Sequence, residues 1–512
     1  MSTLPTVPDI RCAAYEELRE YLRESAIAGS IGSLVGWDQE TYLPRKGAAL
    51  RAEQRRILSR LLHERGTSDR LGELIAECEG DAEVLADPIA VANVREMRKD
   101  YDRAVKLPGD LVESLAECAS LGMNAWREAR AKSDFSLFFP WLKKGIDLNQ
   151  RKADCLSGTP GQNRYDTLMD QYEPGMTSER VRELFGDLRE STLVLLDKVL
   201  SSKNAINASC VTVETDLNSQ RALCEKIMAS VGFDFDAGRF DDTTHPFCSG
   251  FGPGDTRLTN RYRADGWSDS VACAMHEGGH GLYEQGLLKG DHFGQPIAES
   301  ISLGIHESQS RLWENQVGRS VEFLTWVRPM IEEYLGSSAA GTSVDELYQA
   351  VNELKPSFIR VESDELTYNL HIMLRFDFER AMIEGELDPK DLAPEWNKRI
   401  KSDLGLDVSN DAQGCLQDVH WSMTAMGYFP TYTLGNMYAA TWWNQIAKDV
   451  PNRDELIAKG DFAPVLGWTR TNIHTHGRRY GAEELCKLLT GDGLSAKPLI
   501  NYLTEKVDRL YG

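Results

Sequence analysis

The residues with the clearest chemical potential form one short run, His276-Glu277-Gly278-Gly279-His280. In a helix, the two histidines are one turn apart and project from the same face, where their imidazoles can bind one zinc ion. Glu277 leaves the backbone about 100° round from His276. It would therefore lie beside the metal, where a carboxylate can take a proton from water. The motif predicts a hydrolytic metal centre.

The residues around the motif favour this interpretation over a chance match on a solvated helix. The chain has only 10 histidines among 512 residues, so an accidental match is uncommon. Residues 272–275 are small and apolar, as expected of a buried helix. Gly278 and Gly279 each destabilise a helix interior by about 1 kcal/mol relative to alanine. That penalty makes sense if another segment must approach this face closely.

A catalytic zinc site needs a third protein ligand and keeps one position open for water. The downstream sequence offers three candidates, Glu284, Glu299 and Glu307. Glu284 falls on the same helical stripe as the two histidines, which favours a supporting role or a solvated charge. Glu299 and Glu307 are spaced to lie on a neighbouring helix, and spacing alone does not choose between them.

The composition excludes several classes of protein. With 512 residues, 41% of them hydrophobic, the chain exceeds the usual size of a single core, so we expect two lobes or one large unit with a cleft. The formal net charge of −22 argues against nucleic acid or an anionic membrane as a partner. Because the sequence shows neither a long apolar run nor a leader pattern, we expect a cytoplasmic protein without a membrane span.

The ten cysteines are dispersed along the chain, and none forms a Cys-x-x-Cys pair. This distribution indicates reduced, mostly buried thiols rather than a disulfide framework or a cysteine-ligated zinc site. Cys248 and Cys273 lie near the predicted metal site in the sequence, but small apolar filler is the commoner role of such residues.

Helical periodicity dominates the N-terminal third of the chain. In residues 11–28, Tyr15, Leu18 and Leu22 recur at helical spacing among charged residues. Pro44 predicts that a helix ends shortly before it. A further long helix is expected from the apolar pattern of residues 181–195.

Residues 232–262 differ from the rest because they are rich in glycine, aromatic residues and threonine and show little helical period. We expect loops with a small hairpin or sheet here, and residues 255–262 are the best strand. A strand just before the metal helix has an evident use: at the edge of a sheet it could hold an extended peptide by backbone hydrogen bonds.

The rest of the chain returns to helices. We expect a helix over residues 296–317, a helical stretch over 344–384, and a loop followed by a helix over 413–448. No repeat or linker divides residues 1–512, which predicts one catalytic unit. Within this unit we expect an N-terminal helical lobe (residues 1–230), a metal and substrate-binding core (231–450) and a C-terminal helical segment (451–512).

Six short motifs occur in order along the chain. They are Trp-Asp-Gln-Glu-Thr-Tyr-Leu-Pro at 37–44, His-Pro-Phe at 245–247, Asp-Thr-Arg-Leu-Thr at 255–259, His-Glu-Gly-Gly-His at 276–280, His-Glu-Ser-Gln-Ser at 306–310 and Gly-Cys-Leu-Gln-Asp-Val-His-Trp at 414–421. Together they resemble the motifs of the M32 metallocarboxypeptidases, the thermostable carboxypeptidase Taq family. The resemblance runs from residue 37 to about 440, although we would expect methionine where this chain has Leu43.

The resemblance implies a mainly α fold with a deep active-site groove and a small β-sheet beside the metal. It implies that Glu307 is the third ligand and Glu277 the general base. The implied metal is zinc, one ion per chain, and cobalt can replace it. The family also implies a homodimer that removes single residues from peptide C-termini, with broad preference but poor action next to proline.

Peptide hydrolysis also requires hydrogen-bond donors where the tetrahedral oxyanion forms. His420 and the tyrosines of residues 427–432 are suitable, since related peptidases with helical grooves use a histidine and a tyrosine downstream. We favour His420 and Tyr432, with Tyr428 as a substitute. The competing interpretation is that these are buried polar residues satisfied by their own hydrogen bonds.

A carboxypeptidase must recognise a free carboxylate, and arginine can bind one through two parallel hydrogen bonds. Arg360 is the first candidate, and Arg257 and Arg375 are weaker ones. The competing interpretation is that each is an ordinary solvated or ion-paired arginine. Three histidines could contact the substrate or support the site, namely His245, His306 and His371.

These features together predict a zinc-dependent metallocarboxypeptidase whose substrates are peptides with a free C-terminus. One alternative is an endo-oligopeptidase of the helical-groove type, which would also cleave peptides with an amidated C-terminus. Another is a peptide-binding scaffold with a structural metal, which would bind zinc without hydrolysing any peptide. Glu277 argues against the scaffold, because a structural site does not need a base.

Overall fold

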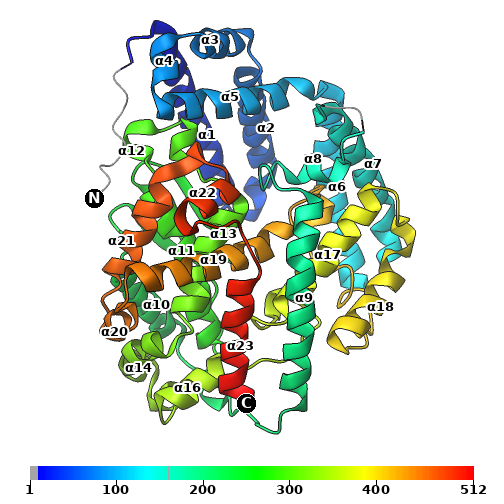
Figure 1. Ribbon diagram of the computed structural model, residues 1–512. Helices are drawn as coiled ribbons and strands as arrows, with labels where there is room; N and C mark the ends of the chain where they lie inside the picture. Colours follow the sequence, from blue (N-terminus) through cyan, green and yellow to red (C-terminus); the bar gives the residue numbers. More distant parts are fainter. Residues whose placement is uncertain (1–9, 159–160) are drawn as a thin grey trace. The chain divides into compact units, whose positions relative to one another are not determined.

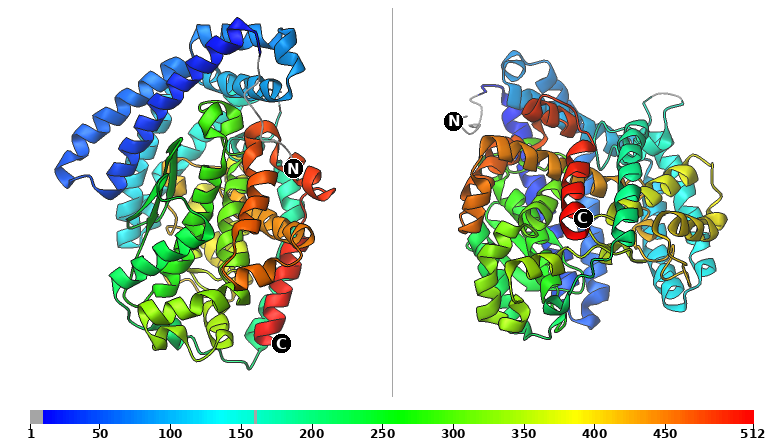
Figure 2. Two further views of the ribbon diagram at one scale, coloured as in Figure 1. Left: turned by 90° about the vertical axis from the view of Figure 1, so that its left-hand side faces the viewer. Right: turned by 60° about the horizontal axis from the view of Figure 1, so that its bottom comes forward.

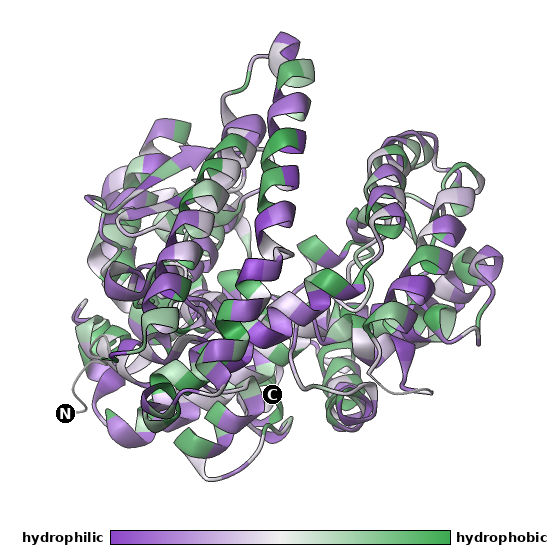
Figure 3. Ribbon diagram, turned by 90° about the horizontal axis from the view of Figure 1, so that it is seen from above, coloured by the Kyte–Doolittle hydropathy of each residue, from purple (hydrophilic) through white to green (hydrophobic). Residues whose placement is uncertain are grey.

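The computed structural model describes residues 10–158 and 161–512, and helices form most of it (Figure 1). Colouring by hydropathy shows polar and apolar residues alternating along the long helices (Figure 3). One three-stranded sheet completes the architecture. The mainly α fold with a small sheet that we expected is therefore confirmed.

The described chain divides into two compact units, and each unit combines three segments that are distant in sequence. Unit 1 consists of Met1–Val105, Asn207–Val351 and Thr441–Gly493. Unit 2 consists of Lys106–Ile206, Asn352–Ala440 and Leu494–Gly512. The predicted parts were consecutive stretches of the chain, at 1–230, 231–450 and 451–512, whereas the segments of the two units alternate along the sequence.

Unit 1 contains the sheet and most of the helices. Its principal elements, in chain order, are α1 (Ala13–Thr41), α2 (Ala48–Gly66), α3 (Asp69–Glu79), α4 (Ala82–Ala86), α5 (Pro88–Lys106), α10 (Leu217–Val231), β1 (Gly238–Asp242), β2 (Cys248–Gly252), β3 (Asp255–Asn260), α11 (Trp267–Gly286), α12 (Lys289–His292), α13 (Leu303–Arg311), the π-helix η5 (Leu312–Val317), α14 (Val321–Leu335), α15 (Ser337–Ala340), α16 (Val344–Val351), α20 (Arg453–Ala458), α21 (Ala463–Asn472) and α22 (Ala482–Thr490). Short 3₁₀ turns supplement them at η1 (Arg45–Gly47), η3 (Ser209–Thr212), η4 (Pro296–Ala298) and η9 (His474–Arg479).

Unit 2 is helical in its described part. Its elements are α6 (Gly109–Lys132), η2 (Phe135–Leu137), α7 (Phe139–Leu156), α8 (Arg164–Met169), α9 (Ser178–Ser201), η6 (Arg360–Glu362), α17 (Tyr368–Ile383), η7 (Pro389–Asp391), α18 (Leu392–Leu404), η8 (His420–Met423) and α23 (Lys497–Tyr511). Helix α19 (Pro430–Asp449) belongs to unit 2 up to Ala440 and to unit 1 from Thr441.

Helices α1 and α2 pack side by side as an antiparallel hairpin (Figure 2). The first turns of α1 are anchored by Tyr15 and Leu18, which are fully buried in a cluster with α3 and α5. Further along, α1 ends at Thr41, so the helix end that Pro44 predicted is confirmed. By contrast, every residue of α2 in the described structure is at least partly exposed. The hairpin is thus held through both ends of α1, because Trp37 near its C-terminal end is also buried and lies under Arg257 of β3.

The sheet has the order β1-β3-β2 and packs against α11 (Figure 2). Strand β3 pairs in parallel with β1, where Gly238 faces Thr256, and antiparallel with β2, where Cys248 faces Leu258. The strand expected over residues 255–262 is therefore present, but it is the central strand. Because its backbone groups are used on both sides, β3 is not the edge that we expected to hold a peptide.

The remaining helices follow the predicted pattern with shorter pieces. Residues 296–317 form η4, α13 and η5 rather than one helix, and residues 344–384 form α16, η6 and α17. The helix expected over residues 181–195 lies within α9, and the loop followed by a helix at 413–448 ends in α19. The breaks coincide with special backbone positions. One is Ser302, whose side chain accepts a hydrogen bond from the backbone N–H of Ile305 and so starts α13.

Candidate metal centre

Helix α11 carries three of the predicted site residues, His276, Glu277 and His280. Its two motif glycines allow neighbouring helices to approach closely. A Cβ on Gly279 would lie 2.5 Å from the carbonyl oxygen of Gln309 in α13. One on Gly278 would lie 2.0 Å from the Met228 side chain of α10. The close approach that could explain these glycines is therefore present, and it brings α13 against α11.

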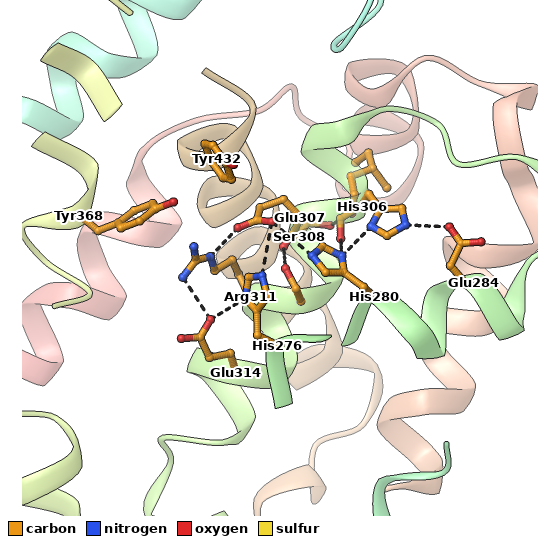
Figure 4. Close-up of polar contacts among 12 residues, drawn as sticks. His276, His280, Glu284, His306, Glu307, Ser308, Arg311, Glu314, Tyr368 and Tyr432 are labelled. Carbon is orange, nitrogen blue, oxygen red and sulfur yellow. Dashed lines mark hydrogen bonds and ion pairs between the residues drawn. The ribbon is translucent and has the colours of Figure 1, made fainter. Parts of the chain in front are cut away.

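Helix α13 presents Glu307 to the two histidines, and the three side chains point toward one another (Figure 4). Their ligand atoms all lie within 4.8 Å of one another. Oε2 of Glu307 is 3.5 Å from Nε2 of His280 and 3.9 Å from Nε2 of His276. Two atoms bound tetrahedrally to one zinc ion lie about 3.3 Å apart. Two imidazole nitrogens and one carboxylate oxygen at these distances fit a zinc ion after a small inward shift.

His276 is oriented by a carboxylate that the sequence analysis did not identify. Glu314 of the π-helix η5 lies 2.8 Å from Nδ1 of His276, the nitrogen opposite the one that faces Glu307. Burial raises the pKa of Glu314, but Arg311 and His276 outweigh burial and hold that pKa well below its usual range. Arg311 also donates a 2.7 Å hydrogen bond to Glu307. One arginine thus ties the predicted ligand to the residue that orients His276.

His280 has a different set of partners. Its Nδ1 lies 3.1 Å from the carbonyl oxygen of His306 and 2.6 Å from Nδ1 of that residue. Nε2 of His306 in turn lies 2.8 Å from Glu284. In both candidate ligands, the imidazole nitrogen that faces away from the site therefore contacts another polar group, as is usual for histidines that bind metals.

Glu277 lies on the buried face of α11 and is 6% exposed. Burial raises the pKa of its carboxyl, the positive His276 opposes the rise, and the negative Glu307 adds to it, which gives a pKa of about 7. A carboxyl group in this range can both accept and return a proton near neutral pH. The arrangement suits a general base.

The other two candidates for the third ligand lie elsewhere. Glu299 forms an ion pair with Arg478 at 3.1 Å, and its side chain is 55% exposed. Glu284 contacts His306 and Lys289 instead of joining the group of three. Among the described residues, the geometry therefore brings Glu307 together with the two histidines.

The predicted oxyanion donors form a group of their own in unit 2. Nε2 of His420 lies 3.2 Å from the hydroxyl of Tyr432, and the ring of Tyr428 packs against both. Burial lowers the pKa of His420 to about 4, so its imidazole is neutral near pH 7. Nδ1 of His420 is buried and has no hydrogen-bond partner among the described residues.

Arg360 is almost fully buried in unit 2 and is held by Asp418. Its Nε and Nη2 lie 2.9 Å and 2.8 Å from Oδ1 of that carboxylate. Its Nη1 donates a 3.0 Å hydrogen bond to the hydroxyl of Tyr368. Asp418 also accepts a hydrogen bond from Arg375, at 2.6 Å. Arg360 therefore has an ion-pair partner, and its Nη1 side faces a neutral hydroxyl.

Arg257 and His245 belong to the sheet region of unit 1. Arg257 on β3 binds Asp255 through two hydrogen bonds of 2.8 Å and 2.9 Å. Its guanidinium lies over the rings of Trp37 and Phe251. His245 is exposed in the loop between β1 and β2.

Sequence reasoning missed Glu314, Arg311 and Asp418. A usable signal existed for the first two, because Glu307, Arg311 and Glu314 recur at spacings of four and three residues and so share a helix face. Asp418 stood inside one of the quoted motifs, but its pairing with two arginines from separate elements has no counterpart in local spacing.

The chain is similar to known proteins over nearly its whole length. The sequence model of the carboxypeptidase Taq (M32) metallopeptidases matches residues 17–507. The chain is 41% identical to thermostable carboxypeptidase 1 of Thermus thermophilus, with 98% of this chain and 99% of the relative covered. It is 37% identical to carboxypeptidase 1 of Bacillus subtilis, with 97% and 98% covered.

Solved structures are also similar over nearly the whole chain. The crystal structure of the M32 carboxypeptidase from Deinococcus radiodurans superposes with a TM-score of 0.94 at 35% identity, and 98% of this chain and 100% of that chain are covered. The structure of Pyrococcus furiosus carboxypeptidase gives a TM-score of 0.93 at 34% identity, with 98% and 100% covered.

Proposed function

The chain belongs to the carboxypeptidase Taq (M32) family and is a metallocarboxypeptidase, and we propose that His276, His280 and Glu307 hold its catalytic metal, a single zinc ion. The observation that carries this proposal is the convergence of the three ligand atoms from α11 and α13. When bound, zinc supplies Lewis acidity, which lowers the pKa of water and polarises a carbonyl. Cobalt, which accepts the same nitrogen and oxygen donors, would replace zinc.

Glu277 acts as the general base in this proposal. It takes a proton from the attacking water and later returns it to the leaving amine. Its position next to His276 on the buried face of α11, and its pKa of about 7, support both transfers. Glu314 and Arg311 keep His276 and Glu307 in place while the proton moves.

We assign His420 and Tyr432 as the donors that stabilise the oxyanion, with Tyr428 as the substitute. The neutral state of His420 and its hydrogen bond to Tyr432 support this role. Asp418 fixes the backbone two residues before His420 because it is paired with two arginines. Replacing Tyr432 by phenylalanine should lower kcat by about 10²-fold or more, as expected for the loss of one such donor.

Arg360 is our first candidate for the substrate carboxylate, with Arg257 and His245 as further contacts. The Nη1 of Arg360 donates to the neutral Tyr368 hydroxyl at 3.0 Å, so a carboxylate could replace a weak contact there. Replacing each candidate arginine by lysine in turn would identify the one that binds the substrate carboxylate. The variant that lacks the true contact should lose the preference for a free over an amidated C-terminus, whereas the other should keep it.

The substrates in this proposal are peptides with a free C-terminus, cleaved one residue at a time with broad preference and poorly next to proline. Zinc analysis together with cleavage of paired free and amidated peptides tests it. We expect about one zinc per chain, loss of activity on chelation, and cleavage of the free peptide alone. Equal cleavage of the amidated peptide would instead favour an endo-oligopeptidase, and zinc without hydrolysis would favour a scaffold.

We also propose a homodimer formed through the hairpin of α1 and α2. Seven of the seventeen exposed large hydrophobic residues in the described chain lie on or between these helices. Residues 25–37 of α1 carry no charge, and three aliphatic side chains there share one exposed side, namely Ile27, Ile31 and Leu34. A Cβ on any of three glycines of this stretch would meet no atom of the described structure within 4 Å; these are Gly29, Gly32 and Gly36.

A second copy of the same uncharged face is the partner that fits, because neither copy would bury an unpaired charge.

The ten free cysteines support the cytoplasmic location that we propose. The net charge of −22 supports the proposal that neither nucleic acid nor a membrane is a partner. No helix in the described part of the chain combines the length and the apolarity that a membrane crossing needs.

A further inference from the structure

A series of polar side chains leads away from His280 inside unit 1 (Figure 4). Nδ1 of His280 lies 2.6 Å from Nδ1 of His306, and Nε2 of His306 lies 2.8 Å from Oε1 of Glu284. The other carboxylate oxygen of Glu284 is paired with Lys289. Glu284 is therefore two hydrogen bonds away from a proposed metal ligand.

These contacts determine where the protons lie once His280 binds metal. A ligating nitrogen must offer its lone pair, so binding through Nε2 requires that His280 carry its proton on Nδ1. Two ring nitrogens 2.6 Å apart cannot both carry a proton, so Nδ1 of His306 must accept. His306 then carries its own proton on Nε2, from where it donates to Glu284. The carboxylate at the far end thus favours the His306 tautomer that offers Nδ1 as an acceptor to His280, next to the backbone carbonyl of His306 at 3.1 Å.

Glu284 is well placed to act as that acceptor. Its side chain is 15% exposed and that of Lys289 12%. Burial raises the pKa of Glu284, but His306 and Lys289 outweigh it and lower that pKa to about 2. Strand β2 closes over the pair, since a Cβ on Gly250 would lie 2.1 Å from Oε2 of Glu284 and 2.6 Å from Nζ of Lys289. The carboxylate is therefore ionised and enclosed.

We propose that Glu284 is a positioning residue which, through His306, fixes the tautomer and orientation of His280 and so strengthens metal binding. This inference rests on the proposed function, because it takes His280 as a ligand. The two imidazoles are then held by different routes, His276 by the Glu314 carboxylate and His280 by the backbone carbonyl and the imidazole of His306. Partners of this kind are typically worth 10- to 100-fold in metal affinity.

The test compares zinc dissociation constants, measured by competition with a chromogenic chelator on the full chain. Glu284→Gln removes the charge but keeps an oxygen that can accept from His306, whereas Glu284→Ala removes both. We expect Glu284→Ala to weaken zinc binding about 10- to 100-fold and Glu284→Gln clearly less. Glu299→Ala is the matched control, because it removes a nearby carboxylate that contacts Arg478 instead, and it should bind zinc as the wild type does.

Two outcomes would overturn the inference while leaving the metal site intact. One is wild-type affinity in Glu284→Ala, and the other is an equal loss in both Glu284 variants, which would mean that charge alone matters. If the wild type itself bound no zinc, the proposed function would fail instead. Thermal melting of the metal-free forms separates a folding defect from a binding defect.

If Glu284→Ala does not fold, a measurement on the wild-type protein tests the inference instead. Histidine-selective ¹⁵N NMR of the zinc-loaded wild type distinguishes the two neutral tautomers of each ring, and His306→Gln assigns the His306 signal. We expect His306 to be protonated on Nε2 and His280 on Nδ1. Finding the proton of His306 on Nδ1 would rule out the proposed series of hydrogen bonds.

Discussion

At the scale of single residues, each unit contains a buried carboxyl group with a raised pKa. Glu277 and Glu379 are both buried carboxyls whose pKa values are raised to about 7, chiefly by loss of water. Glu277 lies beside the candidate metal ligands, whereas Glu379 accepts hydrogen bonds from Tyr165, Trp421 and Gly427 in unit 2. A shifted pKa alone therefore does not identify a catalytic group.

Replacing Glu277 by glutamine should abolish proton transfer while leaving the ligands in place. We expect kcat to fall by about 10²- to 10⁴-fold, the usual contribution of a general base. Steady-state kinetics on a free peptide and zinc content on the same sample provide the measurement. Glu299→Gln is the control and should retain both. A Glu277→Gln enzyme with more than about a tenth of the wild-type rate would remove Glu277 from this role.

Glu379 should make the free energy of unfolding depend on pH. Its folded-state pKa of about 7 exceeds the ordinary value of 4.5, so the folded protein binds this proton more tightly than the unfolded chain. The stabilisation is fully present below about pH 4.5 and is lost as pH rises through about 7, a change of roughly 3 kcal/mol.

Urea unfolding of the wild type and of Glu379→Gln across pH 4.5 to 7.5 checks this sign. The glutamine at residue 379 cannot ionise. The unfolding free energy of the wild type should therefore fall relative to that of the variant as pH rises across this range. A difference that stays constant with pH would show that Glu379 does not titrate there.

At the scale of elements, the contact between α11 and α13 decides the geometry of the metal centre. The backbone of α13 at Gln309 and Ser310 lies where a side chain on Gly279 would be. Further contacts hold α13 in this position, since Gln309 binds His474 at 3.0 Å and Ser308 accepts from Trp442 at 3.2 Å. Glu307 therefore meets the histidines because α13 is fixed against one glycine face.

Introducing a methyl group at Gly279 should separate the two helices. Because the clash is with backbone atoms, it cannot be relieved by turning a side chain, so Gly279→Ala should destabilise the fold by about 1–3 kcal/mol and weaken zinc binding. Gly186→Ala in α9 is the control, since no described atom lies within 4 Å of its Cβ, and it should stabilise the fold by up to about 1 kcal/mol. Denaturant unfolding and chelator competition measure both effects, and unchanged zinc affinity in Gly279→Ala would contradict the argument.

At the scale of the whole molecule, the residues that we propose for metal binding, catalysis and substrate binding come from both units. His276, His280, Glu307 and Glu277 belong to unit 1, whereas His420, Tyr432 and Arg360 belong to unit 2. Each unit is assembled from three separate segments. Its folding therefore depends on contacts between residues far apart in the chain, which raises the entropy cost of forming it.

The proposed dimer gives a further prediction at this scale. Ile31 is 49% exposed in the uncharged stretch of α1, so Ile31→Arg should place a charge in the subunit contact. We expect the wild type to have the mass of two chains by light scattering and the variant that of one. Val194→Arg, at a site on α9 that is 67% exposed, should leave the dimer intact. A wild type with the mass of one chain would disprove the dimer.

The sequence by itself determined the features that depend on local spacing. The placement of His276, Glu277 and His280 on one helix, the helical character of most of the chain and the small sheet before α11 all follow from periodicities of a few residues. The close approach at Gly278 and Gly279 was also indicated, because glycine in a helix interior is costly without such a neighbour.

Only the tertiary structure decided which distant groups meet. It brought Glu307, rather than Glu284 or Glu299, to the histidines, and it paired Arg360 with Asp418. It also placed β3 in the centre of the sheet and interleaved the segments of the two units. The physical reason is that the register between two helices is set by how their side chains and backbones pack, and that packing has no counterpart in the spacing of residues along one chain.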